Sequence, residues 1–251
     1  IDLNQTVSAI DQAAEVLKKM ARDGKKILFV GTKKQLKDIV AEKVSAVGMP
    51  YVIERWPGGM LTNFPTIRKA VKKMATIDKL TNDGTYSNLS KREILQITRQ
   101  RAKLEKNLGS IADLSRLPAA LFVIDVMKEN IAVREANRLG IPVFAIVDTN
   151  SDPSNIDYVI PANDDATKSV DVILTACCTA IAEGLEERKA ERGEEADEKQ
   201  EKPRRERVRK VAKPVESIED APAAEEAPAT EEAPAEAKPK RTRKAAPAKE
   251  A

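Results

Sequence analysis

Three short runs in this chain contain only apolar residues, and they limit the possible folds more than any other feature. The runs are Ile27–Val30, Ala120–Ile124 and Val143–Val147. Four or five apolar residues without alternation are typical of a strand that is buried on both faces. Strands of this kind occur in parallel sheets with helices packed on both sides. The runs therefore predict an α/β fold.

Helical patterns separate the apolar runs. Apolar residues recur at helical spacing in four segments, which are 4–23, 31–47, 131–139 and 164–185. The second of these is expected to open at Gly31-Thr32, and Asp164-Asp165 are expected to cap the last. Shorter strands are expected at Tyr51–Ile53 and Tyr158–Ile160. This alternation predicts a doubly wound parallel five-stranded sheet with right-handed crossovers, for which the strand order 2-1-3-4-5 is suitable.

The segment Arg55–Pro65 interrupts the alternation of strands and helices. It contains Gly58-Gly59, two prolines and the only tryptophan of the chain, Trp56. Glycine permits backbone angles that other residues avoid, and proline prevents a helix from continuing. We expect a structural corner at which Trp56 anchors the chain to the sheet. The alternative is that Arg55 and Trp56 contact a nucleic acid, since an arginine beside an aromatic residue suits that role.

Two helical segments follow this corner before the third strand. Apolar residues at helical spacing predict two matching seams, and they are Ile67, Val71, Met74, Ile77 and Leu80, then Ile94, Ile97, Leu104 and Leu108. Asn82-Asp83-Gly84 is a turn pattern, and Ser90 is suited to cap the second helix. We expect residues 65–108 to form an inserted antiparallel coiled-coil hairpin.

The hairpin is strongly basic. Arg68–Asn107 contains 11 basic and 4 acidic residues, a net charge of +7. A local positive field attracts polyanions, although a solvated helix face is the simpler interpretation. Basic residues at helical spacing form stripes opposite the apolar seams. With the two residues of the corner, the candidate RNA-binding residues are Arg55, Trp56, Arg68, Lys69, Lys72, Lys73, Arg92, Arg99, Lys103 and Lys106.

The C-terminal part of the chain differs in composition from the rest. Residues 188–251 contain no aromatic residue and are rich in Ala, Pro, Glu and Lys. Such a segment cannot bury enough apolar surface to offset its loss of conformational entropy. We expect a disordered tail there, serving either as an RNA-binding arm or as a solubilising extension. The expected domains are 1–64 with 109–187 for the α/β part, 65–108 for the hairpin and 188–251 for the tail.

Composition argues against several kinds of chemistry. The chain has no histidine, and its two cysteines, Cys177 and Cys178, are adjacent. The chain therefore lacks the residue that most often acts as a general base, and its cysteines do not have the spacing of a zinc or redox site. We expect no catalytic residue, metal site, cofactor or membrane span. The competing hypothesis is a nucleotide-dependent enzyme that uses Lys33, Asp125 and Asp148 at the carboxyl ends of the strands.

Several longer motifs resemble the bacterial ribosomal protein S2 family. The matching stretches cover essentially all of residues 1–185, and they are Lys26–Lys33, Arg55–Asn63, Leu117–Asp125, Glu135–Val143, Asp148–Pro153 and Ile160–Ala166. Two features depart from the family pattern. The N-terminal segment of the family is missing from this sequence, and the long tail is an extension.

The resemblance implies a flavodoxin-like α/β domain with an inserted hairpin and no catalytic activity. It also implies a structural constituent of the small ribosomal subunit, located in the cytoplasm. The partners implied are small-subunit ribosomal RNA and neighbouring small-subunit proteins. Among these proteins is ribosomal protein S1, which captures messenger RNA. A non-ribosomal RNA-binding adaptor that works through the hairpin and tail is a further alternative.

Overall fold

The structure is a computed structural model that describes residues 1–82 and 90–211. The chain divides into two units, Ile1–Pro203 and Arg204–Ala251, and each is described by itself. Of the second unit, only the end of the last helix is described. The predicted turn at Asp83-Gly84 and the tail beyond residue 211 lie outside the described residues.

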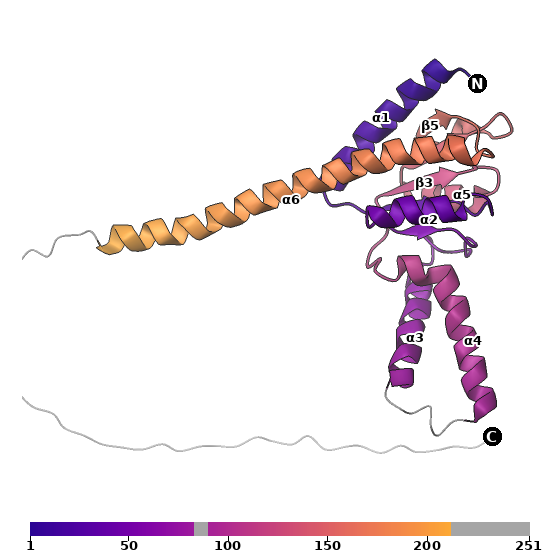
Figure 1. Ribbon diagram of the computed structural model, residues 1–251, viewed down its shortest axis with the longest axis horizontal. Helices are drawn as coiled ribbons and strands as arrows, with labels where there is room; N and C mark the ends of the chain where they lie inside the picture. The colour runs from indigo at the N-terminus through magenta and orange to yellow at the C-terminus, as the bar shows by residue number, and fades with distance from the viewer. Residues whose placement is uncertain (83–89, 212–251) are drawn as a thin grey trace, which may run out of the picture. The chain divides into compact units, whose positions relative to one another are not determined.

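Helices and strands alternate along the first unit (Figure 1). In chain order they are α1 (Leu3–Arg22), β1 (Ile27–Val30), α2 (Lys37–Ala46), β2 (Tyr51–Val52), α3 (Phe64–Asn82), α4 (Lys91–Leu108), η2 (Gly109–Ile111), β3 (Ala120–Ile124), α5 (Asn130–Leu139), β4 (Val143–Val147), η3 (Pro153–Asn155), β5 (Tyr158–Pro161) and α6 (Thr167–Val211). None of the helices in the described residues is long and apolar enough to cross a membrane.

The five strands form one parallel sheet in the order β2-β1-β3-β4-β5. Phe29 on β1 is aligned with Phe122 on β3, and Phe122 is aligned with Phe144 on β4. Every residue of β1, β3 and β4 is buried, as expected for strands covered on both faces. The predicted α/β class and the doubly wound strand order are confirmed.

Alternate residues of each strand enter two separate apolar cores. Phe29, Phe122 and Phe144 belong to the core that contains the buried residues of α1, α2 and α6. The intervening Leu28 and Leu121 belong to the core on the other face, with residues of α5 and of the segment around Trp56. Because neighbouring residues of a strand point to opposite faces, one apolar run serves both cores.

The α2 helix begins later than the sequence pattern predicted. It starts at Lys37 rather than at Gly31-Thr32, and residues 34–36 form a turn before it. The cause is visible at Thr32, whose backbone N–H and hydroxyl both donate to the Glu129 carboxylate. These bonds connect Thr32 to Glu129, the residue before α5, and the residues directly after β1 do not adopt a helical conformation. Gly31-Thr32 is therefore not a helix N-terminus that could bind a phosphate.

The α6 helix packs closely against α1 and extends beyond the predicted start of the tail. A Cβ atom at Gly184 would lie 2.4 Å from the Lys18 carbonyl oxygen, so this contact requires glycine. The helix runs to Val211, whereas disorder was predicted from residue 188. Glu, Ala, Lys and Arg predominate in residues 188–211, and all four favour helix even without an apolar face. Periodicity alone could not detect such a helix.

Candidate nucleic-acid interface

The α3 and α4 helices follow one another between β2 and β3, and they project together from the sheet (Figure 1). The ends of α3 and α4 nearest the sheet pack against the apolar core that contains Leu28 and Leu121. They do so through partly buried residues that include Phe64, Ile67 and Leu104. Further along the pair, Arg101 of α4 forms an ion pair with Asp78 of α3. Residues 83–89 lie outside the described residues, so an antiparallel coiled coil remains a prediction.

The start of α4 is fixed by the cap expected from the sequence. The Ser90 hydroxyl accepts a hydrogen bond from the Glu93 backbone N–H, and the Glu93 carboxylate accepts one from the Ser90 N–H at 3.0 Å. This reciprocal capping box satisfies two N–H groups that a helix end would otherwise leave free. These bonds to Ser90 also hold the pKa of the Glu93 carboxyl below its ordinary value.

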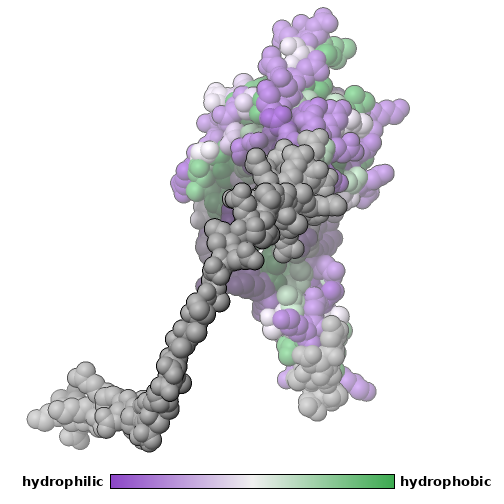
Figure 2. Space-filling model, turned by 90° about the vertical axis from the view of Figure 1, so that its left-hand side faces the viewer, coloured by the Kyte–Doolittle hydropathy of each residue, from purple (hydrophilic) through white to green (hydrophobic). Residues whose placement is uncertain are grey.

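The two helices of the pair are strongly basic. Together α3 and α4 contain 11 basic and 3 acidic residues. Figure 2 shows hydrophilic side chains, in purple, on the visible face of the pair, with apolar side chains between them. All eight of the predicted RNA-binding residues on the two helices are exposed, and they are Arg68, Lys69, Lys72, Lys73, Arg92, Arg99, Lys103 and Lys106.

The acidic residues of the pair are already engaged within the pair. Arg101 binds both Asp78 and Glu105, while Glu93 is part of the capping box. Two of the predicted residues also have internal partners. Arg68 donates to the Ser115 carbonyl oxygen at 2.7 Å, and Lys106 lies 3.4 Å from the Glu54 carboxylate.

The other six predicted cations of the pair have no ion-pair partner within the described part of the chain, and they are Lys69, Lys72, Lys73, Arg92, Arg99 and Lys103. Unpaired, exposed cations on two neighbouring helices can meet the phosphates of a nucleic acid without first breaking internal contacts. The pair therefore has the charge and the exposure that a phosphate-binding surface needs.

The two predicted residues of the corner have different environments. Arg55 is exposed and forms no ion pair with any described residue. Trp56 is only 6% exposed, and its indole Nε1–H donates to the Glu135 carboxylate at 3.2 Å. A buried ring cannot stack on a base, so Trp56 has the structural role that was weighed against a nucleic-acid contact. Of the two residues of the corner, only Arg55 is exposed.

Glu135 was not found from the sequence, although it organises this corner. It lies on the buried side of α5 among Ala132, Val133 and Ala136, and it is 8% exposed. A glutamate at an apolar helix position indicates a buried partner, because an unpaired buried carboxylate is costly. The sequence contained that indication, but not the identity of the partner.

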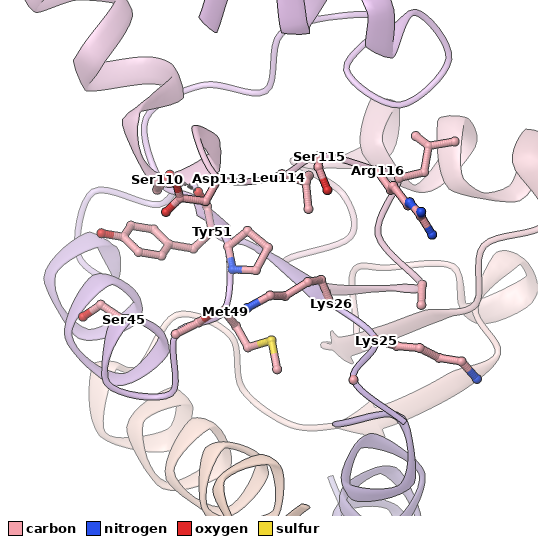
Figure 3. Close-up of a pocket in the computed structure, with 15 residues that line it drawn as sticks. Lys25, Lys26, Ser45, Met49, Tyr51, Ser110, Asp113, Leu114, Ser115 and Arg116 are labelled. Carbon is pink, nitrogen blue, oxygen red and sulfur yellow. Dashed lines mark hydrogen bonds between the residues drawn. The ribbon is translucent and has the colours of Figure 1, made fainter. Parts of the chain in front are cut away.

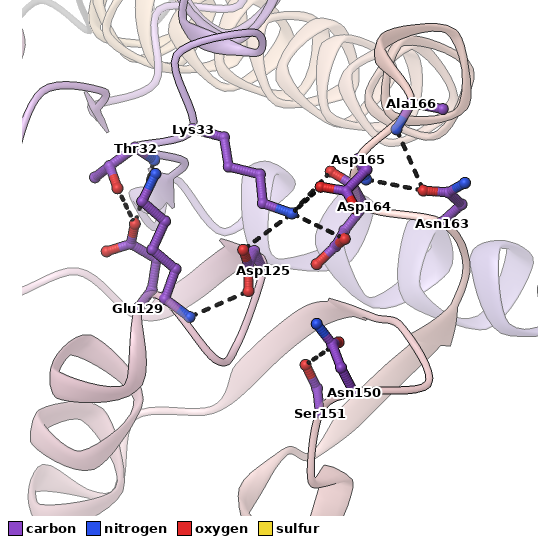
Figure 4. A network of polar contacts seen from close by, with 11 residues as sticks. Thr32, Lys33, Asp125, Glu129, Asn150, Ser151, Asn163, Asp164, Asp165 and Ala166 are labelled. Atoms are coloured by element: carbon purple, nitrogen blue, oxygen red, sulfur yellow. Dashed lines mark hydrogen bonds and ion pairs between the residues drawn. The ribbon is translucent and has the colours of Figure 1, made fainter.

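At the carboxyl ends of the strands, where a nucleotide would be expected, Lys33 points toward three acidic side chains (Figure 4). Lys33 Nζ lies 3.0 Å from Asp125, 2.9 Å from Asp164 and 2.8 Å from Asp165. Burial acts to lower the pKa of Lys33, but hydrogen bonds to these carboxylates outweigh it and raise the pKa. The lysine is thus a fixed counter-charge rather than a free phosphate ligand.

Two further acidic residues at this edge, the proposed Asp148 and its neighbour Asp152, accept hydrogen bonds from the local backbone. Asp148 accepts a hydrogen bond from the Thr149 N–H, and Asp152 accepts one from the Ser154 N–H. Asn163, rather than Asp164 or Asp165, accepts the N–H bonds that precede α6. Within the described residues no group of three or more acidic or cysteine side chains is placed to hold a metal ion.

A pocket of about 650 Å³ lies at the other end of the strands, near their amino ends (Figure 3). Residues that precede β1, β2 and β3 line it, including Lys25, Lys26 and Met49. Lys26 donates to the Gly48 carbonyl oxygen at 2.8 Å, and Lys25 pairs with Asp23 at 3.0 Å. Both lysines therefore already have internal partners. The position of the pocket also does not match the ligand crevice of such folds.

Comparisons with known proteins identify close relatives. A family model described as ribosomal protein S2 matches residues 1–184. A small ribosomal subunit protein uS2 from Phocaeicola vulgatus is 83% identical over 192 residues, which cover 76% of this chain and 69% of the relative. Proteins of the same description from Bacteroides thetaiotaomicron and Porphyromonas gingivalis are 81% and 74% identical. The match to the Bacteroides thetaiotaomicron protein covers 76% of this chain and 69% of that protein. The match to the Porphyromonas gingivalis protein covers 76% of this chain and 68% of that protein.

Proposed function

The chain belongs to the ribosomal protein S2 family, and we propose that it attaches to small-subunit ribosomal RNA through the free cations of α3 and α4. Membership makes it a structural constituent of the small ribosomal subunit in a family without enzymatic activity. The RNA attachment is the step that the geometry supports, because six of the predicted cations of the pair are exposed and lack an ion-pair partner among the described residues.

The proposal assigns the RNA contact to the helix pair together with Arg55, while Trp56 acts only inside the fold. Phosphate contacts by lysine and arginine give affinity without sequence specificity, and each contact releases counterions from the RNA. A projecting pair of helices can place its cations along an RNA groove or backbone. The proposal also places the protein in the cytoplasm, because bacterial ribosomes work there.

The two alternatives considered from the sequence have less support. A nucleotide-dependent enzyme would need Lys33 free for a phosphate, but three carboxylates hold it. Family membership also argues against an enzyme and against an adaptor that works outside the ribosome.

Seating of ribosomal protein S1 is the second part of the proposal, and it rests on the family resemblance. Neighbouring small-subunit proteins would share the exposed surface with RNA. Small subunits assembled without this chain should then carry less ribosomal protein S1 than complete subunits. Equal occupancy in both preparations would remove this part of the proposal and leave the RNA attachment untouched.

The salt dependence of RNA binding tests the main proposal. Arg92, Arg99 and Lys103 would be changed together to glutamine, since all three are exposed and unpaired among the described residues. The slope of log affinity against log salt concentration should become less steep by roughly 0.7–0.9 for each phosphate that the variant no longer neutralises. Purified small-subunit ribosomal RNA is the probe, and binding is measured at several salt concentrations.

A triple variant of the α/β part provides the matched control. Lys34, Lys128 and Lys168 are also exposed and form no ion pair with a described residue, and changing them to glutamine removes the same charge. The proposal expects this variant to retain the wild-type slope. A slope that falls in the control and not in the α4 variant would move the RNA surface to the α/β part.

A further inference from the structure

One carboxylate accepts five hydrogen bonds from the corner. Glu135 Oε1 accepts from Trp56 Nε1 at 3.2 Å and from the Gly59 N–H at 2.8 Å. Its Oε2 accepts from the Leu61 N–H at 2.9 Å, and from both the N–H and the hydroxyl of Thr62 at 3.1 Å. Five donors from four residues of the corner thus converge on a single side chain of another element, α5.

The corner has few other partners for these donors. Its remaining backbone bonds are local, from Met60 to the Pro57 carbonyl and from Asn63 to the Gly59 carbonyl. Gly59 has a φ of +82°, which favours glycine, and its N–H group donates to the carboxylate. Leu61 is 2% exposed, so without Glu135 its N–H would be buried and unsatisfied.

The carboxylate is also held in its charged form. Burial acts to raise the pKa of Glu135, but the N–H donors of Thr62, Gly59 and Leu61 and the indole of Trp56 outweigh it and lower the pKa. Hydrogen bonds to an ionised acceptor are shorter and stronger than those between neutral groups. The corner is therefore pinned to α5 by a charged centre.

We propose that Glu135 is the positioning residue that fixes the exit of α3 from the α/β part and so sets the direction of the basic helix pair. The α3 helix begins at Phe64, so the bonds of Thr62 lie within two residues of the helix. An interface whose parts are held before binding loses less conformational entropy when it binds. The consequence for RNA rests on the proposed function, whereas the positioning itself does not.

Glu135→Gln is the decisive change because it preserves the shape of the side chain and replaces one acceptor with a donor. Whichever oxygen is replaced by the amide NH₂ group, at least two of the five donors then face another donor. Glu129→Gln is the matched control. Glu129 is also buried, next to the start of α5, but among the described residues it accepts only from Thr32, and a glutamine oxygen can still accept those bonds.

Two readouts report on the corner without RNA. Trp56 is the only tryptophan, so a red shift of its fluorescence reports that the indole has become exposed. Spin labels at Gln12→Cys on α1 and Gln100→Cys on α4 report the spread of distances between the α/β part and the pair. The native Cys177 and Cys178 are buried, which raises the pKa of their thiols to about 12 and about 11 and slows their labelling.

Glu135→Gln is expected to red-shift the Trp56 emission and to broaden the distance distribution, while Glu129→Gln matches the wild type in both. The affinity of Glu135→Gln for purified small-subunit ribosomal RNA should fall about tenfold, equivalent to about 1.4 kcal/mol. Wild-type emission and distances in Glu135→Gln would overturn the proposal. If the wild-type protein itself fails to bind the RNA, the proposed function fails and these two readouts still decide the positioning.

A milder pair of variants covers the case in which Glu135→Gln does not fold. Thr62→Val removes only the hydroxyl bond to Glu135, and Thr62→Ser keeps it. Circular dichroism establishes that each variant is folded. Partial broadening of the distances in Thr62→Val, with the wild-type distribution in Thr62→Ser, supports the proposal. An unchanged distribution in Thr62→Val would contradict it.

Discussion

At the scale of single residues, the buried charges of this protein find their partners in distant parts of the chain. Lys33 follows β1, whereas its partners Asp125, Asp164 and Asp165 follow β3 and β5. Asp164 is 1% exposed, and its Oδ2 has no hydrogen-bond partner among the described residues. Burial raises the pKa of this carboxyl, and the ion pair with Lys33 opposes that effect.

Lys33→Met should therefore destabilise the protein. The substitution keeps most of the length of the side chain. It leaves the two buried carboxylates of Asp125 and Asp164 without their cation. Removing one partner of a buried ion pair costs about 3 kcal/mol, taking the low end of the usual range because Lys33 is 16% exposed. Urea unfolding, followed by circular dichroism, measures the decrease in stability.

Two further variants separate the role of the ion pair from a general effect of lysine. Lys34→Met changes an exposed neighbour that forms no ion pair with a described residue, and its stability should stay within about 0.5 kcal/mol of the wild type. Lys33→Met combined with Asp164→Asn should recover part of the stability, because one uncompensated charge is removed. A Lys33→Met protein as stable as Lys34→Met would contradict this role for the ion pair.

At the scale of elements, the sequence predicted what depends on local pattern. The apolar runs identified the long strands. The Ser90 cap was also predicted, since it depends on residues three positions apart. Such features are decided by neighbours in the chain, so a single sequence contains the information for them.

The features that the sequence did not predict depend on contacts between distant residues. The late start of α2 results from the bond of Thr32 to Glu129, 97 positions away. The hydrogen bond from the Trp56 indole to the Glu135 carboxylate joins residues 79 positions apart. For the candidate site, charge patterning correctly located exposed cations on the helices, but it could not show that Lys106 and Arg68 are partly engaged. Periodicity identifies the faces of a helix but not the residues that will contact them.

At the scale of the whole molecule, the net charge is distributed unevenly along the chain. The complete sequence has a net charge of +3, while α3 and α4 alone contain 11 basic and 3 acidic residues. The remainder is therefore net negative. A protein with this distribution presents RNA with a local attractive region on α3 and α4 rather than with a uniformly basic surface.

The C-terminal segment should contribute little to the stability of the α/β part. Lys18 pairs with Glu187 at 2.9 Å, and the Arg188 side chain covers Gly24, so the packing against α1 and the turn after it extends to residue 188. A chain that ends at Glu191 keeps these contacts. Its melting temperature should match that of the full chain, because residues 192–251 have no aromatic residue and little apolar periodicity.

Calorimetry of the full and shortened chains provides this measurement. A chain that ends at Glu187 is the informative comparison, since it lacks Arg188 and should melt slightly lower. A fall of many degrees in the chain ending at Glu191 would show that the segment packs on the α/β part, contrary to the expected tail.

Sedimentation of the small ribosomal subunit tests attachment through the helix pair most directly. Tagged wild-type protein, the α4 variant with Arg92, Arg99 and Lys103 changed to glutamine, and the control variant at Lys34, Lys128 and Lys168 would be expressed in separate cultures. Gradients are run at low and at high salt, and the tag is followed in each fraction. We predict that the wild type and the control migrate with the small subunit, while the α4 variant shifts to the free fractions as salt increases. An α4 variant that stays with the subunit as firmly as the wild type would contradict attachment through the helix pair.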